Sequence, residues 1–235
     1  MTPIALDKRL SQFVIHEYEA LADPVNAVPM AAYMKTEMPF YGIPKPLRVP
    51  TYRRFKKEFA PANIAEYQDC ISTLWGLSHR EEKYAALEYA QMFDQYITSE
   101  SLPLYERMVR EGQWWDFVDT LAIALVGRVL YKERAKTKKV LDKWIRDDDM
   151  WIRRTAILAQ NRHKAEADEQ MLFGYCLKCA HEKEFFIRKA IGWALREYSY
   201  AAPMAVKRFV KENENVLSPL SVKEGVKQIN RAKTK

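Results

Sequence analysis

Two adjacent tryptophans followed closely by two carboxylates are the part of this sequence best suited to chemistry. Trp114 and Trp115 open a segment with the pattern of a helix, and Asp116 and Asp119 follow them. Trp115 and Asp119 are four residues apart, so they share one face of a helix. A flat ring beside an anion suits a surface that holds a sugar or a base and stabilises positive charge next to it. A second such ring, Trp193, lies in another helical segment.

This combination predicts chemistry at a nucleoside. A tryptophan ring can pack on the apolar edge of a deoxyribose, while a neighbouring aspartate stabilises charge that grows at C1′. Breaking an N-glycosidic bond passes through an oxocarbenium-like transition state, which a fixed anion favours. The same carboxylate could orient or deprotonate an attacking water. One carboxylate is enough when the leaving base is already cationic, because no general acid is then required.

The same residues also fit structural roles. Large aromatic side chains are often buried, so the pattern alone favours core positions for Trp115 and Trp193. Asp116 fits an ordinary acid in the first turn of a helix, and Asp119 fits a salt-bridge partner for an arginine on the next repeat. Core positions are also expected for Trp114, Trp144 and Trp151.

Composition favours an all-α protein that binds a polyanion. The 235 residues are 48% hydrophobic and 29% charged, with only seven glycines and no long alternating run typical of strands. The net charge is +7. Residues 1–120 hold 13 Lys and Arg against 17 Asp and Glu, whereas residues 121–235 hold 25 against 14. Positive charge concentrated in one half of a chain indicates a nucleic-acid partner, although a solvated lysine-rich surface is the alternative.

Helical periodicity runs through the whole chain, broken only by short segments rich in proline. One predicted helix, residues 114–131, carries the Trp-Trp-Asp segment, and another, residues 185–198, carries Trp193. No segment has the composition of a domain linker, so a single domain over residues 1–235 is expected.

A weak internal repeat suggests how the helices are arranged. The segment 151–158 matches the segment 186–193 at an offset of 35 residues. The fold class expected from this repeat is an all-α, HEAT-like solenoid (α-α superhelix) with a concave basic face, although an irregular helical bundle would give similar patterns. In the solenoid, equivalent positions of successive helices form one row: Lys83, Asp119, Arg154 and Lys189. Three cations then flank one lone carboxylate, and the cations can hold DNA phosphates on either side of it.

Other kinds of site have little support. Cys176 and Cys179 have the spacing of a zinc pair, but a structural zinc needs four ligands and no second pair lies at a suitable distance, so core cysteines are expected. Few cysteines favour a reducing, cytoplasmic setting. No apolar run is long enough to span a membrane.

Three segments together resemble the bacterial AlkD-like DNA alkylation repair glycosylases. They are Trp114-Trp115-Asp116-x-Val118-Asp119, Trp151-x-x-Arg154-x-Ala156-Ile157-Leu158 and Glu184-Phe185-Phe186-Ile187-x-Lys189-Ala190-Ile191-Gly192-Trp193-x-Leu195-Arg196-Glu197-Tyr198. The resemblance extends from about residue 29 to residue 221. It implies a HEAT-like solenoid that cradles duplex DNA, and a monofunctional glycosylase that excises cationic N3- and N7-alkylpurines such as 3-methyladenine and 7-methylguanine. It implies no metal and no organic cofactor, and a monomer is expected.

The resemblance also assigns roles to individual residues. Asp119 matches the catalytic aspartate, and Trp115 and Trp193 match the tryptophans that pack on the deoxyribose of the lesion. Arg154 matches an arginine near the lesion phosphate. The remaining residues expected to bind DNA are Arg196, Arg162, Tyr33, Lys45 and Lys189.

One loop departs from the family pattern. Relatives carry a Gln-Thr pair before the second proline of the loop at residues 42–46, and that pair contacts the strand opposite the lesion. Pro44 and Lys45 stand there in this chain, so Lys45 is expected to contact a phosphate instead. The rival hypothesis is a non-catalytic HEAT-like module that binds nucleic acid or protein, because a fold does not fix a function.

Overall fold

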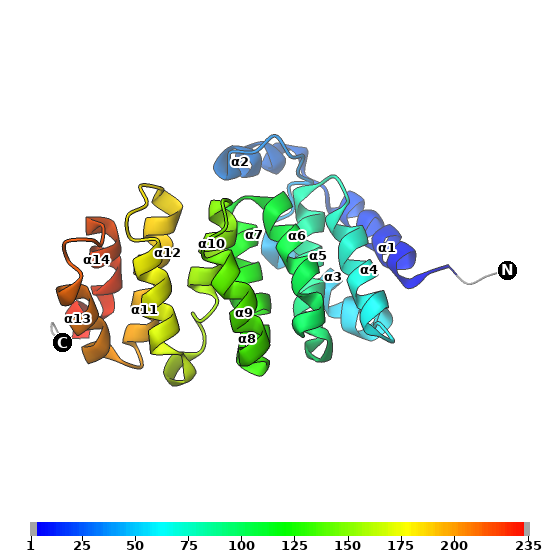
Figure 1. Ribbon diagram of the computed structural model, residues 1–235. Coiled ribbons are helices and arrows are strands. Elements are labelled where there is room, and N and C mark those ends of the chain that lie inside the picture. The colour runs from blue at the N-terminus through cyan, green and yellow to red at the C-terminus, as the bar shows by residue number, and fades with distance from the viewer. Residues whose placement is uncertain (1–3, 233–235) are drawn as a thin grey trace. The chain divides into compact units, whose positions relative to one another are not determined.

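The computed structural model describes residues 4–232, with side chains described to residue 230. Its helices form two compact units, Met1–Ile97 and Thr98–Lys235 (Figure 1). The described residues contain no strand, which confirms the all-α, repeat-like fold class. A continuous helical repeat can span two such units, so the single domain over residues 1–235 stays a prediction.

Four helices of unit 1, α1, α3, α4 and α5, pack around a core rich in tyrosine and phenylalanine, whereas α2 has no buried residue. Tyr18, Phe55, Tyr67 and Tyr89 are fully buried there. The elements of unit 1 are α1 (Leu6–Leu21), α2 (Pro24–Met34), α3 (Lys45–Glu58), α4 (Ile64–Trp75), α5 (Arg80–Met92) and the 3-10 turn η1 (Asp94–Tyr96).

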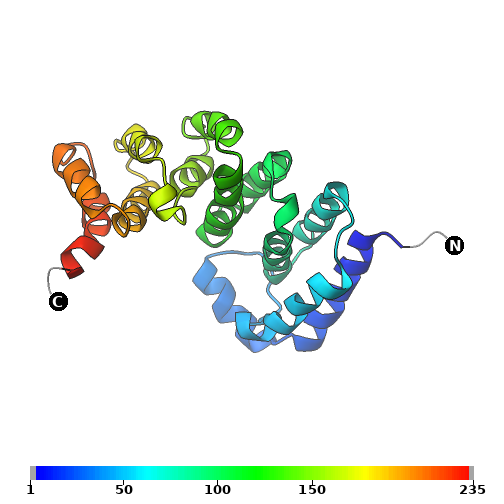
Figure 2. The same cartoon turned by 90° about the horizontal axis from the view of Figure 1, so that it is seen from below.

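Unit 2 stacks its helices in two rows, which Figure 2 shows from below. Along one row, α10 packs against α7 and α12, and α12 packs against α14. The elements of unit 2 are η2 (Ser99–Ser101), α6 (Leu102–Gly112), α7 (Trp115–Thr120), η3 (Leu121–Val126), α8 (Gly127–Lys132), α9 (Arg134–Trp144), α10 (Met150–Leu158), η4 (Lys164–Glu166), α11 (Glu169–Lys178), α12 (Phe185–Ser199), α13 (Pro203–Glu212), α14 (Pro219–Gly225) and α15 (Lys227–Ala232).

The helix starts follow local rules that the sequence displays. The side chains of Asn63, Asp149 and Ser218 accept hydrogen bonds from backbone N–H groups at the starts of α4, α10 and α14. Pro203 and Pro219 stand at the first position of their helices, where the missing N–H group is not needed. These contacts fix where α10 and α14 begin.

A π-helical segment interrupts the predicted helix at residues 114–131. α7 leads directly into the π-helix η3, which continues into α8, so the helix exists but is locally widened. All six residues of η3 are buried. A Cβ atom at Gly127 would meet the backbone oxygen of Ala159 at 2.4 Å, so only glycine lets this helix approach the end of α10 so closely. π-helical turns are frequent next to functional sites, and this one begins two residues after Asp119.

Within the described part of the chain, every helix is too short or too polar to span a lipid bilayer.

Candidate active site

The first turns of α7 present a ring and a carboxylate on one face. Phe117 and Val118 are fully buried and hold α7 against the core. Trp115 is therefore left half-buried, and the Asp119 side chain keeps 17% of its surface exposed. The preference for a core position of Trp115, drawn from the pattern alone, is thus wrong. Both groups are partly accessible from solvent.

The Asp119 carboxylate is not solitary, because Arg154 of α10 holds both of its oxygens. The Arg154 Nε donates to Oδ1 at 2.8 Å and Nη2 donates to Oδ2 at 2.9 Å. The sequence predicted one unpaired anion flanked by free cations, and this arrangement corrects that prediction. The alternative, in which Asp119 pairs with an arginine of the next repeat, is the one observed. Each carboxylate oxygen still has a lone pair that Arg154 does not use.

Arg154 also fastens α10 to α12. Its Nη1 donates to the backbone oxygen of Phe186, so all three guanidinium nitrogens are engaged. The side chain is only 5% exposed. Without DNA, this guanidinium holds Asp119 and the Phe186 backbone oxygen. Its expected place near the lesion phosphate stays a prediction.

An aromatic cluster lies beside this arginine. The rings of Trp114 and Phe186 are 5.5 Å apart, and those of Trp151 and Phe186 are 4.9 Å apart. Trp151 and Trp144 are buried, as predicted for core residues, whereas Trp114 is only half-buried. Rigid rings packed at these distances restrict the position of the Phe186 backbone that Arg154 contacts.

The protonation of Asp119 depends on opposing effects. Burial raises the pKa of the Asp119 carboxyl above its ordinary value, because desolvation penalises the charged form. The hydrogen bonds and positive charge of Arg154 act against this rise, and the nearby Asp116 adds to it. A base with a raised pKa is better matched to proton transfer near neutral pH than an exposed aspartate.

Trp193 stands on α12, two helical turns after Phe186. It is half-buried, so the expectation of a core position is wrong for this ring as well. Its indole Nε1 donates to Glu197 Oε1 at 3.1 Å. The helix that Arg154 ties to Asp119 through Phe186 therefore also carries the second predicted sugar-packing ring. Glu197 fixes the orientation of that ring from one turn further along.

The expected DNA-binding cations of unit 2 differ in their surroundings. Lys189 and Arg196 both pair with Glu224, at 3.2 Å and 2.6 Å. Arg162 is exposed just after α10. Lys189 is thus not the free cation that the row of repeat positions suggested.

The expected site residues of unit 1 are described by themselves. Tyr33 on α2 is 72% exposed. Lys45 opens α3 and pairs with Glu88 at 3.0 Å. Lys83 donates to the backbone oxygens of Trp75 and Leu77 and lies over the Trp75 ring. Its ammonium group therefore stabilises the end of α4, contrary to the role expected from the repeat.

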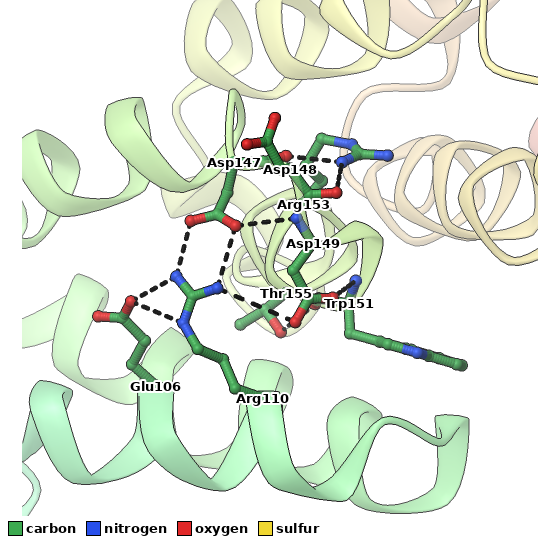
Figure 3. Close-up of polar contacts among 8 residues, drawn as sticks. All are labelled: Glu106, Arg110, Asp147, Asp148, Asp149, Trp151, Arg153 and Thr155. Atoms are coloured by element: carbon green, nitrogen blue, oxygen red, sulfur yellow. Dashed lines mark hydrogen bonds and ion pairs between the residues drawn. The ribbon is translucent and has the colours of Figure 1, made fainter.

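A polar network fixes the loop before α10 (Figure 3). Arg110 of α6 donates to Asp147 at 3.0 Å and 2.7 Å, and to Glu106 at 2.7 Å. Asp149 caps α10 by accepting from the backbone N–H of Trp151 at 2.8 Å. Because α10 carries Arg154, this network helps to define where the partner of Asp119 lies.

The cysteines have no metal-binding arrangement. Cys176 and Cys179 are buried as free thiols, which confirms the prediction of core cysteines. Burial raises the pKa of the Cys179 thiol to about 12, so it stays protonated near neutral pH. Over the part of the chain that the structure describes, no cluster of His, Cys, Asp and Glu could hold a metal ion.

Sequence reasoning missed two acidic residues near the expected site. The spacing of four residues between Trp193 and Glu197 predicts contact on one helix face, and that signal could have revealed Glu197. Glu224 offers no such signal, because it reaches α12 from a helix about 30 residues later in the chain.

Comparison with known proteins bears directly on this arrangement. Residues 14–229 match the model of a family described as DNA alkylation repair enzymes. The chain belongs to the DNA alkylation repair enzyme family. This match confirms the resemblance seen in the sequence, and it covers the Asp119–Arg154 pair, Trp115 and Trp193.

A solved structure is similar over nearly the same extent. It is that of a predicted DNA alkylation repair enzyme from Enterococcus faecalis, with a TM-score of 0.77 and 29% sequence identity. The match covers 88% of this chain and 95% of that chain. A comparison with curated protein sequences finds no match. The family places the protein among enzymes of DNA alkylation repair, and the chemistry it performs has to be argued from the site.

Proposed function

We propose that this family member is a DNA glycosylase that hydrolyses the N-glycosidic bond of cationic N3- and N7-alkylated purines in duplex DNA. The observation that carries the proposal is the Asp119 carboxylate, which Arg154 holds on the same helix face as the half-buried ring of Trp115. Trp193 stands on the helix that Arg154 fastens through Phe186. A fixed anion next to flat rings suits a deoxyribose on which positive charge develops.

The chemistry follows from the charge of the substrate. An alkylated purine with a positive ring leaves as a neutral base, so the glycosidic bond can break without a general acid. The sugar then carries the positive charge, and an anion held in a fixed place stabilises it without reorganisation. Water attacks C1′, and the free lone pairs of Asp119 can orient that water or accept its proton. The Arg154 hydrogen bonds keep the carboxylate in one rotamer throughout.

The pairing with Arg154 also supports the rival hypothesis. A carboxylate neutralised by a guanidinium could simply hold α7 to α10 in a non-catalytic module that binds nucleic acid or protein. The partial exposure of the Asp119 side chain is compatible with the enzyme, because a catalytic carboxylate has to be reached from the surface. The two hypotheses differ in what happens to base release when the carboxylate is replaced.

Base release from methylated duplex DNA tests the proposal. The native protein is expected to release 7-methylguanine and 3-methyladenine, measured chromatographically. Asp119→Asn is expected to slow release on the order of 100-fold while DNA affinity stays nearly unchanged. Asp116→Asn, which removes a neighbouring carboxylate from the same helix, is the matched control and should retain most activity.

A second variant separates catalysis from folding. Asp119→Asn leaves the buried Arg154 charge poorly compensated, and that alone could disturb the structure. The double variant Asp119→Asn, Arg154→Met removes this charge as well, so it should melt closer to the native temperature and still be inactive. Base release by the double variant at the native rate would refute a catalytic role for Asp119.

A further inference from the structure

Two glycines let α12 and α14 come close enough to place a half-buried acid between two cations. A Cβ atom at Gly192 would meet the Glu224 Cβ at 2.6 Å, and one at Gly225 would meet the Leu195 Cβ at 3.1 Å. Because glycine has no Cβ atom, the backbones of the two helices can approach closely at Gly192 and Gly225. Glu224 is thereby pressed against the face of α12 that surrounds Gly192.

Glu224 holds a cation on each side of that contact. Its Oε1 lies 3.2 Å from Lys189 Nζ and its Oε2 lies 2.6 Å from Arg196 Nη1. Burial disfavours the ionised form of this carboxyl, but Lys189, Lys227 and Arg196 together hold its pKa below the ordinary value. Glu224 is thus ionised at neutral pH, and its single carboxylate forms ion pairs with both Lys189 and Arg196.

These two cations flank the ring that we place against the lesion sugar. Lys189 lies one turn before Trp193 on α12 and Arg196 lies one turn after it, so the three share one helix face. The Lys189 side chain is 38% exposed and that of Arg196 is 25% exposed, whereas Glu224 keeps 15%. A DNA backbone that approaches this face can reach the exposed parts of Lys189 and Arg196. The N–H groups on their inner side are already bound to the Glu224 carboxylate.

We propose that Glu224 is an internal substitute for a DNA phosphate, which lowers the affinity of α12 for undamaged DNA by occupying Lys189 and Arg196. A carboxylate and a phosphate oxygen are alternative acceptors for the same N–H groups. DNA phosphates must therefore share or displace Glu224 before they gain both cations. The inference rests on the proposed function only in that duplex DNA binds to this face of α12.

Salt titration of duplex binding by Glu224→Gln tests this inference. Undamaged duplex is used, so that catalysis plays no part. Glu224→Gln releases two cations from part-exposed ion pairs, and this is expected to tighten duplex binding about two- to tenfold at 0.1 M salt. The slope of log K against log salt should also become steeper by about one to two, because each new phosphate contact releases counterions. Glu214→Gln, an exposed acid just after α13, makes the same change in net charge and controls for it.

A protein without the two cations shows whether they cause the tighter DNA binding of Glu224→Gln. In a protein with Lys189→Met and Arg196→Met, the effect of Glu224→Gln should fall to that of Glu214→Gln. Equal effects of the two Gln variants in the native background, or weaker binding by Glu224→Gln, would overturn the inference. If Glu224→Gln melts below the assay temperature, Glu224→Asp, which shortens the side chain by one methylene, should still tighten binding.

The outcome is independent of base release. A native protein that releases methylated bases but binds no more tightly with Glu224→Gln would refute this inference alone. Tighter binding by Glu224→Gln in a protein that releases no base would refute the proposed glycosylase alone.

Discussion

Asp119 and Arg154, 35 residues apart in the chain, are joined by two parallel hydrogen bonds that tie α7 to α10. Arg154 is 5% exposed and Asp119 is 17% exposed, so the pair lies at the edge of the core. The offset equals the period of the internal repeat, so equivalent positions of neighbouring repeats meet here. The same ion pair therefore holds two repeats together and positions the carboxylate of the candidate site.

Removing the arginine alone should destabilise the protein strongly. Arg154→Met leaves Asp119 without a partner in a partly dehydrated place, and breaking such a pair costs about 3 kcal/mol. The double variant with Asp119→Asn should recover part of that loss, which a double-mutant cycle from denaturant unfolding measures. Additive effects of the two substitutions would show that the pair contributes no coupling energy.

The rate of base release should depend on pH through Asp119. Burial raises the pKa of this carboxyl, with Arg154 opposing the rise and Asp116 adding to it. Activity needs the ionised form, so it should be full above this raised pKa and fall as the pH drops through it. The midpoint should lie above the ordinary aspartate value of about 3.9.

Asp116→Asn tests the cause of that midpoint. Removing this neighbouring negative charge should move the midpoint to lower pH, because the Asp119 carboxylate is then easier to ionise. The measurement is the pH profile of single-turnover base release for both proteins. An unmoved or raised midpoint would show that Asp116 does not act on Asp119.

Gly192 and Gly174 should respond to alanine in opposite directions. A Cβ atom at Gly192 would lie 2.6 Å from the Glu224 Cβ and 3.1 Å from the Ser221 oxygen, so Gly192→Ala should push α12 and α14 apart and cost about 1–3 kcal/mol. A Cβ atom at Gly174, inside α11, would meet nothing within 4 Å. Gly174→Ala should therefore stabilise by about 0.5–1 kcal/mol, as in an ordinary helix interior. Denaturant unfolding of both variants gives the comparison.

Asp149, the cap of α10, should stabilise the protein more through its hydrogen-bond acceptor than through its negative charge. Asp149 accepts from the backbone N–H of Trp151 at 2.8 Å. Asp149→Ala should lower the free energy of unfolding by about 1 kcal/mol, whereas Asp149→Asn keeps an acceptor and should lose much less. Asp149 also lies 3.9 Å from Arg110 Nη1. Equal losses for the two variants, measured in urea, would instead indicate that this ion pair carries the effect.

Much of the architecture was determined by the sequence alone. Apolar residues repeat with the helical period, and helix starts are marked by residues such as Pro219 in α14 and the capping Asp149 before α10. Such local signals were enough to predict the all-α fold. The offset of 35 residues placed Asp119 and Arg154 at equivalent positions, and the spacing of four placed Trp115 with Asp119. Both relationships are fixed spacings along the chain, which a linear pattern records directly.

Only the tertiary structure decided how charged side chains are paired. Asp119 looked solitary because its partner comes from another helix, and Lys189 looked free because Glu224 reaches it from α14. The widened helix after Asp119 was equally hidden, since all six residues of η3 are apolar and therefore show no period. Which cation meets which anion depends on helix packing of ångström precision, such as the contact at Gly192, and a periodic pattern carries no information about that distance.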